Sequence, residues 1–221
     1  MNIKNIKGLK YPDEYFIKFF FKFQLQNKNN LTYLELGCSN GCNLMLPYQF
    51  NNHVIGIDLD GTLIEYANYN FKLLDQLNKY KFYNQDMREF LQEQLNIQAD
   101  LLILANSIYY IPKEDFIQML KNIKSNNLIN KNIPFFIRFR NTDDYRNNKG
   151  NIIEPNSIII NNNITGEDGL FCKFYDKNEM IEILKKELDL KDFEVMNIKY
   201  DNIQNNTIVS NSDIVIWGTI N

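Results

Sequence analysis

The sequence Tyr33–Met45, YLELGCSNGCNLM, places a short apolar run directly before a glycine-containing turn. Gly37, Ser39 and Gly41 stand at alternate positions, and helix-like sequence resumes after Gly41. Glycine allows backbone conformations and close approaches that a Cβ atom would block. A turn of this kind between a strand and a helix is typical of a loop that a ligand approaches closely. The alternative is a tight turn that binds nothing.

Strand and helix patterns alternate on both sides of this turn. Because each parallel crossover needs a covering helix, the alternation predicts a seven-stranded, mostly parallel α/β sheet with helices on both faces. A loop joins the last two strands, which predicts that the final strand is antiparallel. The predicted strands are 32–37, 53–58, 80–86, 99–106, 133–140, 193–201 and 213–220, and the predicted helices are 12–26, one after Gly41, 61–78, 87–95, 113–126 and 177–188.

The bulk composition excludes several classes of protein. The 221 residues are enough for a single domain, 1–221, with a full core. A net charge of -3 and a pI near 5.3 argue against a nucleic-acid partner, which normally selects clustered positive charge. We expect no membrane partner, because no run of eighteen apolar residues occurs, and a cytoplasmic location, because the first residues lack a signal core. The sequence does not decide between a monomer and a homodimer.

The three cysteines predict neither a disulfide framework nor a metal site. Cys38, Cys42 and Cys172 form no C-x-x-C pair, so zinc spacing is missing. We expect Cys38 and Cys42 to pack as small apolar residues.

Acidic residues end the first three predicted strands or lie close to their ends. Asp58 closes the second strand, where a carboxylate suits a ribose diol, and Asp86 closes the third, where a carboxylate can accept from an adenine amine. Glu35 precedes the glycines and would repel a pyrophosphate, while Ser39 and Cys42 replace two glycines of a dinucleotide fingerprint. A cofactor with a cationic end therefore fits better than a dinucleotide.

Four segments together resemble the motifs of the class I S-adenosylmethionine-dependent methyltransferases: ELGCSNG, VIGIDLD, NQDM and ADLLILANSIYYI. The resemblance implies a Rossmann-like fold and S-adenosyl-L-methionine as cofactor, with Ser39 departing from the family's middle glycine. It assigns the methionine part to Glu35 and the loop Gly37, Cys38, Ser39 and Gly41, the ribose end to Asp58 and Leu59, the adenine to Asp86 and Met87, and the cofactor amino group to Asn106.

The segment YPDEYFIKFFF resembles the start of a bacterial subset of this family that modifies small molecules or surface polysaccharides. The resemblance implies that residues 1–30 form a lid helix, that Tyr11 lies near the cofactor and that the reaction serves capsule or surface-glycan precursor synthesis. Residues 141–172 are polar, with at most a short strand at SIIIN, and we expect them to form a substrate-side insertion.

Arginine placement predicts the charge of the methyl acceptor. Only four arginines occur beside twenty lysines, yet Arg138, Arg140 and Arg146 fall within nine residues. The guanidinium fork binds carboxylate or phosphate in a bidentate way, and alternation puts Arg138 and Arg140 on one face of their strand. We therefore expect a small, anionic acceptor such as a phosphoryl, carboxylate or sugar-linked oxygen. The alternative is salt bridging to Asp143, Asp144 or Glu154.

The catalytic candidates are Tyr109, Arg138 and Arg140, and the substrate-binding candidates are Tyr110, Arg138, Arg140 and Arg146. The single histidine, His53, begins a strand and so lies away from the predicted site. Without it, the acceptor is already anionic or its base is Tyr109, Asp144 or Glu167. Three further alternatives stay open: N-methylation of an amino sugar or other amine, a non-catalytic cofactor-binding module, and an NAD-dependent oxidoreductase.

Overall fold

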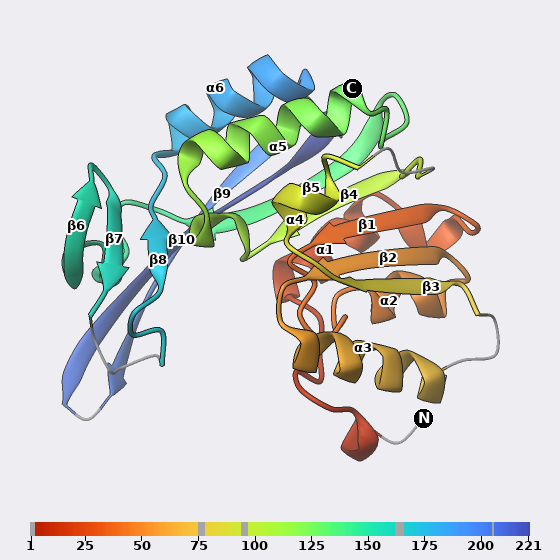
Figure 1. Ribbon diagram of the computed structural model, residues 1–221, viewed down its shortest axis with the longest axis horizontal. Helices are drawn as coiled ribbons and strands as arrows, with labels where there is room; N and C mark the ends of the chain where they lie inside the picture. The colour runs from red at the N-terminus through yellow and green to blue at the C-terminus, as the bar shows by residue number, and fades with distance from the viewer. Residues whose placement is uncertain (1–2, 75–77, 94–96, 162–165, 205) are drawn as a thin grey trace.

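A seven-stranded sheet forms the centre of the computed structural model, which describes residues 3–74, 78–93, 97–161, 166–204 and 206–221. The strand order is β3-β2-β1-β4-β5-β10-β9, and β10 runs antiparallel to both of its neighbours (Figure 1). The predicted sheet and its antiparallel last strand are therefore confirmed. The strands are β1 (Thr32–Leu36), β2 (His53–Asp58), β3 (Tyr80–Asn84), β4 (Leu101–Ala105), β5 (Ile133–Arg140), β9 (Lys191–Gln204) and β10 (Thr207–Ile220).

Helices cover both faces of this sheet (Figure 1). One face carries α1 (Glu14–Lys22), α2 (Met45–Gln49) and α3 (Gly61–Leu74), and the other carries α4 (Met87–Phe90), α5 (Lys113–Ser125) and α6 (Lys177–Leu188). Short 3-10 helices span Ile3–Asn5, Leu25–Asn27, Ile108–Tyr110 and Tyr145–Asn148. The predicted helix 87–95 already ends at Phe90 as α4. Residues 75–77 of the predicted helix 61–78 and residues 94–95 lie outside the described residues. No helix among the described residues is long and apolar enough to cross a membrane.

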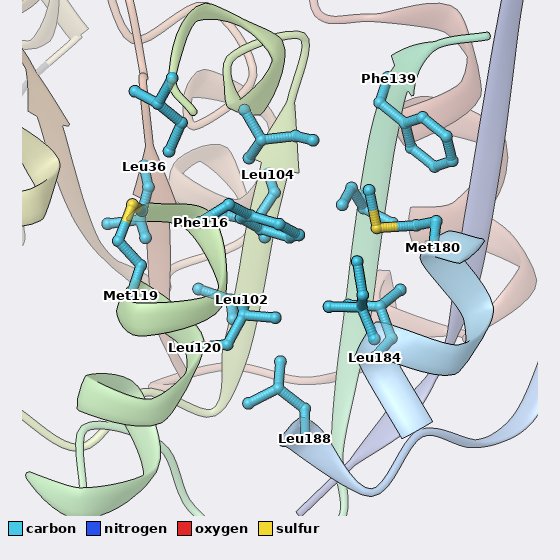
Figure 2. Packing of buried hydrophobic residues seen from close by; sticks show 14 of the residues in the cluster. Leu36, Leu102, Leu104, Phe116, Met119, Leu120, Phe139, Met180, Leu184 and Leu188 are labelled. Carbon is cyan, nitrogen blue, oxygen red and sulfur yellow. The ribbon is translucent and has the colours of Figure 1, made fainter. Parts of the chain in front are cut away.

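The two faces of the sheet bury different kinds of side chain. Under α5 and α6 the core is mostly aliphatic: Phe116 and Leu120 of α5 and Leu184 of α6 pack over Leu102 and its neighbours (Figure 2). Under α1 the core is aromatic, and it includes Phe16, Phe19, Phe136 and Trp217. Full burial of such large side chains stabilises each layer by roughly 1.5–3 kcal/mol per residue, which fixes the strand ends that carry the site.

Three features differ from the sequence prediction. The first helix ends at Lys22 rather than at 26, because Gln24 adopts a left-handed conformation (φ 52°) that an α-helix does not allow. Residues 141–172 contribute a separate three-stranded sheet, β6 (Gly150–Glu154), β7 (Ser157–Ile160) and β8 (Phe171–Lys173), of which only the middle strand was predicted. The β9–β10 hairpin is also longer than predicted and extends beyond the main sheet (Figure 1).

The strand order brings the candidate residues together. Parallel pairing sets Leu36 beside Ile57 and Asp58 beside Asn84, so β1, β2 and β3 end at one edge of the sheet. Next to β1 the order reverses toward β4, and ligands bind at such a switch point in open α/β sheets.

Candidate active site

A cavity of about 960 Å³ opens over the carboxyl ends of β1 to β4. Its walls come from the N-terminal segment, the glycine turn, the ends of β2 and β3, the residues after β4 and the loop before β8. The volume lies near the upper end of the roughly 300–1,000 Å³ that ligand sites usually have, which suits a cofactor together with an acceptor. Of the predicted cofactor residues, all line this cavity except Gly41: Tyr11, Glu35, Gly37, Cys38, Ser39, Asp58, Leu59, Asp86, Met87 and Asn106.

The glycine turn is held against the neighbouring strand ends by its backbone. Gly37 and Cys38 both donate from their amides to the carbonyl oxygen of Ile57, at 2.8 and 2.9 Å. Gly37 has φ 78°, and a Cβ atom there would overlap the side chain of Ser107. Ser107 in turn donates from Oγ to the Leu36 carbonyl at 2.7 Å. Gly37 is therefore required for the close approach of the turn to the segment that follows β4.

Gly41 serves packing rather than the cavity. Its φ is 73°, and an added Cβ would lie 2.9 Å from the ring of Phe71. The neighbouring thiols of Cys38 and Cys42 are buried at the cavity wall, and burial raises the pKa of both. A thiol kept neutral in this way is a poor nucleophile and a poor metal ligand.

Asp58 is oriented by two backbone amides. Ser39 donates to Oδ2 at 2.7 Å and Asp60 donates to Oδ1 at 3.0 Å. Ser39 reaches this position in a left-handed conformation, φ 51°, which explains why glycine suits that place in the motif. The half-buried carboxylate of Asp58 keeps lone pairs for hydroxyl donors, because each carboxylate oxygen can accept about two hydrogen bonds.

Glu35 is the most deeply buried acid of the cavity, with 1% of its surface exposed. Asn43 donates from Nδ2 to its Oε1 at 2.6 Å, while Oε2 is buried and has no hydrogen-bond partner in the structure. Burial, reinforced by the negative charges of Asp58 and Asp13, raises the pKa of Glu35 to about 8. An unpaired buried carboxylate oxygen on a cavity wall indicates that a cationic ligand belongs beside it.

Asp13 is a cavity residue whose role at the site was not predicted. It caps α1 by accepting from the amides of Tyr15 and Phe16, and its own amide donates to Asn43 Oδ1 at 2.8 Å. Its Oδ2 accepts from Asn106 Nδ2 at 3.3 Å and from Arg138 Nη1 at 2.6 Å. An acidic residue before an amphipathic run predicts a helix N-cap, but no local pattern predicts that Asp13 contacts Asn106 and Arg138.

The carboxylate of Asp86 is already paired with the side chain of Arg88. It caps α4 through the amide of Arg88 at 2.9 Å and pairs with the Arg88 guanidinium, which also reaches Asp115. Hydrogen bonds from Arg88 hold the pKa of Asp86 below its ordinary value. Adenine recognition by the Asp86 side chain stays a prediction, and Met87 beside it lines the cavity.

The other arginines lie behind the cavity wall, and each is paired with acids. Arg138 bridges Asp13 and Asp213 in a nearly buried cluster. Glu167 receives the guanidinium groups of both Arg140 and Arg146. Arg146 also pairs with Asp144 at 2.9 Å, as the salt-bridge alternative predicted, whereas Asp143 pairs with Lys199 and Glu154 with Lys173.

The arrangement removes the structural basis for an anion pocket built by Arg138, Arg140 and Arg146. None of the three lines the cavity, and their carboxylate partners already neutralise them. The spacing of residues in the sequence could not predict these ion pairs, because Asp213, for example, lies on a strand 75 residues after Arg138. Their contact with substrate stays a prediction that the geometry does not favour.

The two tyrosines after β4 differ in position. Tyr110 lines the cavity and donates from its hydroxyl to Glu167 at 2.7 Å, and burial raises its pKa to about 12. Tyr109 is buried behind it under the guanidinium of Arg140, 4.1 Å from the ring centroid, and burial raises its pKa well above its ordinary value. Tyr110 rather than Tyr109 therefore lines the cavity. His53 is exposed at the start of β2, away from the cavity, as predicted.

Comparison with known proteins agrees with this architecture. A family model described as a methyltransferase domain matches residues 34–126. A search of curated protein sequences gave no significant match. Many solved structures have the same fold. A SAM-dependent methyltransferase from Methanosarcina mazei aligns with TM-score 0.67 at 14% identity, over 90% of this chain and 98% of that one.

Two further solved structures extend the comparison. A SAM-dependent methyltransferase from Archaeoglobus fulgidus aligns with TM-score 0.61 at 15% identity, covering 94% of this chain and all of that one (100%). Magnesium protoporphyrin IX methyltransferase from Synechocystis PCC 6803, solved with bound SAM, aligns with TM-score 0.56 at 15% identity over 93% of this chain and 76% of that one.

Residues 34–126 match a methyltransferase domain, and the chain has the Rossmann-like fold of solved SAM-dependent methyltransferases, whose cofactor is S-adenosyl-L-methionine. The residues present fit this cofactor. The unpartnered Oε2 of Glu35 suits the cofactor's ammonium group, and the anchored carboxylate of Asp58 suits a ribose diol.

Proposed function

We propose that the chain transfers a methyl group from S-adenosylmethionine to an oxygen of a small-molecule acceptor that enters the Tyr110 side of the cavity. The observation that carries the proposal is Glu35 Oε2, a buried carboxylate oxygen without a partner on the wall of a cavity large enough for two ligands. A dinucleotide is disfavoured at the same place, because Glu35 would repel a pyrophosphate.

When bound, the cofactor would supply the methyl group of its sulfonium and be left as S-adenosylhomocysteine, while the acceptor oxygen would give up its proton to solvent. The chain contributes binding and alignment. Glu35 accepts hydrogen bonds from the ammonium group, and Asp58 accepts from ribose hydroxyls. Alignment of this kind can supply roughly 7–11 kcal/mol of the barrier in well-oriented reactions.

The finer parts of the proposal rest on the sequence. The N-terminal resemblance supports a cytoplasmic enzyme of capsule or surface-glycan precursor synthesis. The absence of histidine from the cavity among the described residues supports an acceptor that is already anionic or that loses its proton to another group. Residues 1–30 as a lid and 141–172 as a substrate-side insertion are supported by the cavity residues that these segments supply.

Calorimetric titration of the full chain with S-adenosylhomocysteine tests the proposal, with NADH as the matched control. We expect saturable binding of S-adenosylhomocysteine and no measurable binding of NADH. The reverse preference would establish a dinucleotide site and overturn the proposal. Transfer of a labelled methyl group from S-adenosylmethionine to a chromatographically separated product then distinguishes an enzyme from a binding module.

A further inference from the structure

The two sides of the cavity differ in chemistry. Glu35, Asp58 and Asp86 stand at the ends of β1, β2 and β3, and each presents a carboxylate. The side formed by the N-terminal segment, the residues after β4 and the loop before β8 is richer in apolar and aromatic groups. Beside the polar residues Asp13, Asn106 and Ser107, it carries six apolar or aromatic side chains: Leu9, Tyr11, Tyr110, Ile111, Leu170 and Phe171.

Four of these six side chains are large and exposed. The exposed fractions are 60% for Leu9, 71% for Tyr11, 38% for Tyr110 and 46% for Leu170. Single exposed apolar side chains are ordinary, but their convergence on one cavity marks a surface that a ligand covers. Burying them against an apolar ligand would gain roughly 25 cal/mol for each Å² removed from water.

The apolar side is built by specific contacts. β8, which begins with Phe171, packs against the 3-10 helix Ile108–Tyr110, and both elements line the cavity. Glu167 binds the Tyr110 hydroxyl and two arginines, and so fixes the start of the loop that carries Leu170. The cluster of Glu167, Tyr110, Arg140 and Arg146 therefore holds this side of the cavity in place. This structural role accounts for the two arginines, for which the sequence had predicted contact with substrate.

Positive charge is already neutralised around this side. Arg138 is paired with two carboxylates, Arg140 and Arg146 share Glu167, and Arg88 is paired with Asp86. Within the described parts of the chain, no arginine at or behind the cavity is left to receive an anion. A phosphate or carboxylate there would lose its hydration without a compensating ion pair.

We propose that the acceptor is an uncharged, flat aromatic compound bearing a hydroxyl group, bound among Tyr11, Tyr110, Leu170 and Phe171. This inference rests on the proposed function and names its substrate class. Aromatic side chains form offset-stacked or edge-to-face pairs with an aromatic ligand, each worth about 0.5–1.5 kcal/mol beyond area burial. An anionic acceptor, expected from the arginines, is the competing outcome.

The test compares two probes that share one ring system, 2-naphthol and 2-naphthyl phosphate. The full-length protein is saturated with S-adenosylhomocysteine and titrated with each probe by calorimetry. We expect 2-naphthol to bind at least tenfold more tightly than its phosphate ester. Equal binding, tighter binding of the ester, or no binding of 2-naphthol at millimolar concentration would overturn the inference.

Substitution at the wall locates the binding. Leu170→Ser should weaken 2-naphthol binding at least threefold and leave S-adenosylhomocysteine affinity unchanged, because Leu170 is exposed and contributes little to the core. Ile153→Ser is the matched control: it removes an even more exposed apolar side chain on β6 outside the cavity and should change neither affinity. Equal losses in both variants would contradict the assigned wall.

The titration with S-adenosylhomocysteine alone separates the two proposals. If it binds and 2-naphthol does not, only the acceptor class is wrong. If it does not bind, the proposed function fails and the acceptor class fails with it.

Discussion

Asn43 Nδ2 lies 2.6 Å from Glu35 Oε1, so one amide fixes a buried carboxylate of the cavity wall and leaves its second oxygen without a hydrogen-bond partner. The same Asn43 accepts from the amide of Asp13. The acid that ends the first strand and the N-terminal segment above it are therefore positioned by one side chain.

Glu35→Gln should weaken S-adenosylhomocysteine binding about tenfold to a hundredfold, because a neutral amide cannot balance an ammonium group as a carboxylate does; hydrogen bonds to charged groups are worth about 1.5–3 kcal/mol. Calorimetry of the purified variant measures the change. Gln24→Glu, which changes charge in the opposite sense at a turn outside the cavity, is the control and should bind normally. An unchanged affinity in Glu35→Gln would contradict the role of this acid.

The unliganded protein should lose stability as the pH rises from about 4.5 to about 8 through the Glu35 contribution. The pKa of Glu35 is raised on folding, so the folded state holds a proton that the unfolded state releases within this window. Thermal unfolding at pH 5.5 and pH 8 measures the loss, and Glu35→Gln should reduce it. A pH dependence identical in both proteins would exclude Glu35 as its source.

Binding of the cofactor product at pH 7 should release a proton, because a cation beside Glu35 favours its charged form. Calorimetric titrations in two buffers of different ionisation enthalpy should differ in observed heat. The difference should shrink in Glu35→Gln. Heats that do not depend on the buffer would show that Glu35 is already ionised before binding.

Asp58→Ala should weaken S-adenosylhomocysteine binding strongly, at least tenfold, because the ribose hydroxyls lose their acceptor and the Ser39 amide loses its own. Asp201→Ala removes an exposed acid from β9 and is the matched control. The prediction fails if both variants bind equally well.

Arg138→Ala should destabilise the fold by about 3–5 kcal/mol, because it leaves Asp13 and Asp213 buried without their cation. Urea unfolding measures this change. Lys22→Ala breaks an exposed pair with Glu194 and should cost at most about 1 kcal/mol. A stable Arg138→Ala variant with weakened acceptor binding would instead restore the substrate role predicted from the sequence.

The sequence predicted the sheet well because the signals are local. Continuous apolar runs such as Leu101–Ala105 mark strands buried on both faces, and Asp60 caps the next helix locally through the amides of Thr62 and Leu63. Asp58 was found for the same reason: a polar residue that ends a parallel strand is set at the ligand edge by the topology alone.

Contacts between distant segments could not be predicted. Asn43 and Asp13 meet Glu35 only after folding, and no spacing in the sequence relates them. The arginines predicted an anionic acceptor because the sequence does not show which acids pair with them. Asp213 lies on the last strand, and Glu167 lies in a glycine-containing loop. The small sheet β6–β8 was largely missed because its short strands are stabilised by pairing rather than by a local pattern.

The attachments of residues 7–13 have a consequence for biosynthesis. Asn40 donates hydrogen bonds to the carbonyl oxygens of Lys7 and Leu9. Asp13 forms an ion pair with Arg138, which also pairs with Asp213. Residues 7–13 are synthesised early, whereas Arg138 and Asp213 are synthesised much later. A nascent chain released before the final hairpin would lack Asp213, and Arg138 would then hold Asp13 without its second carboxylate partner.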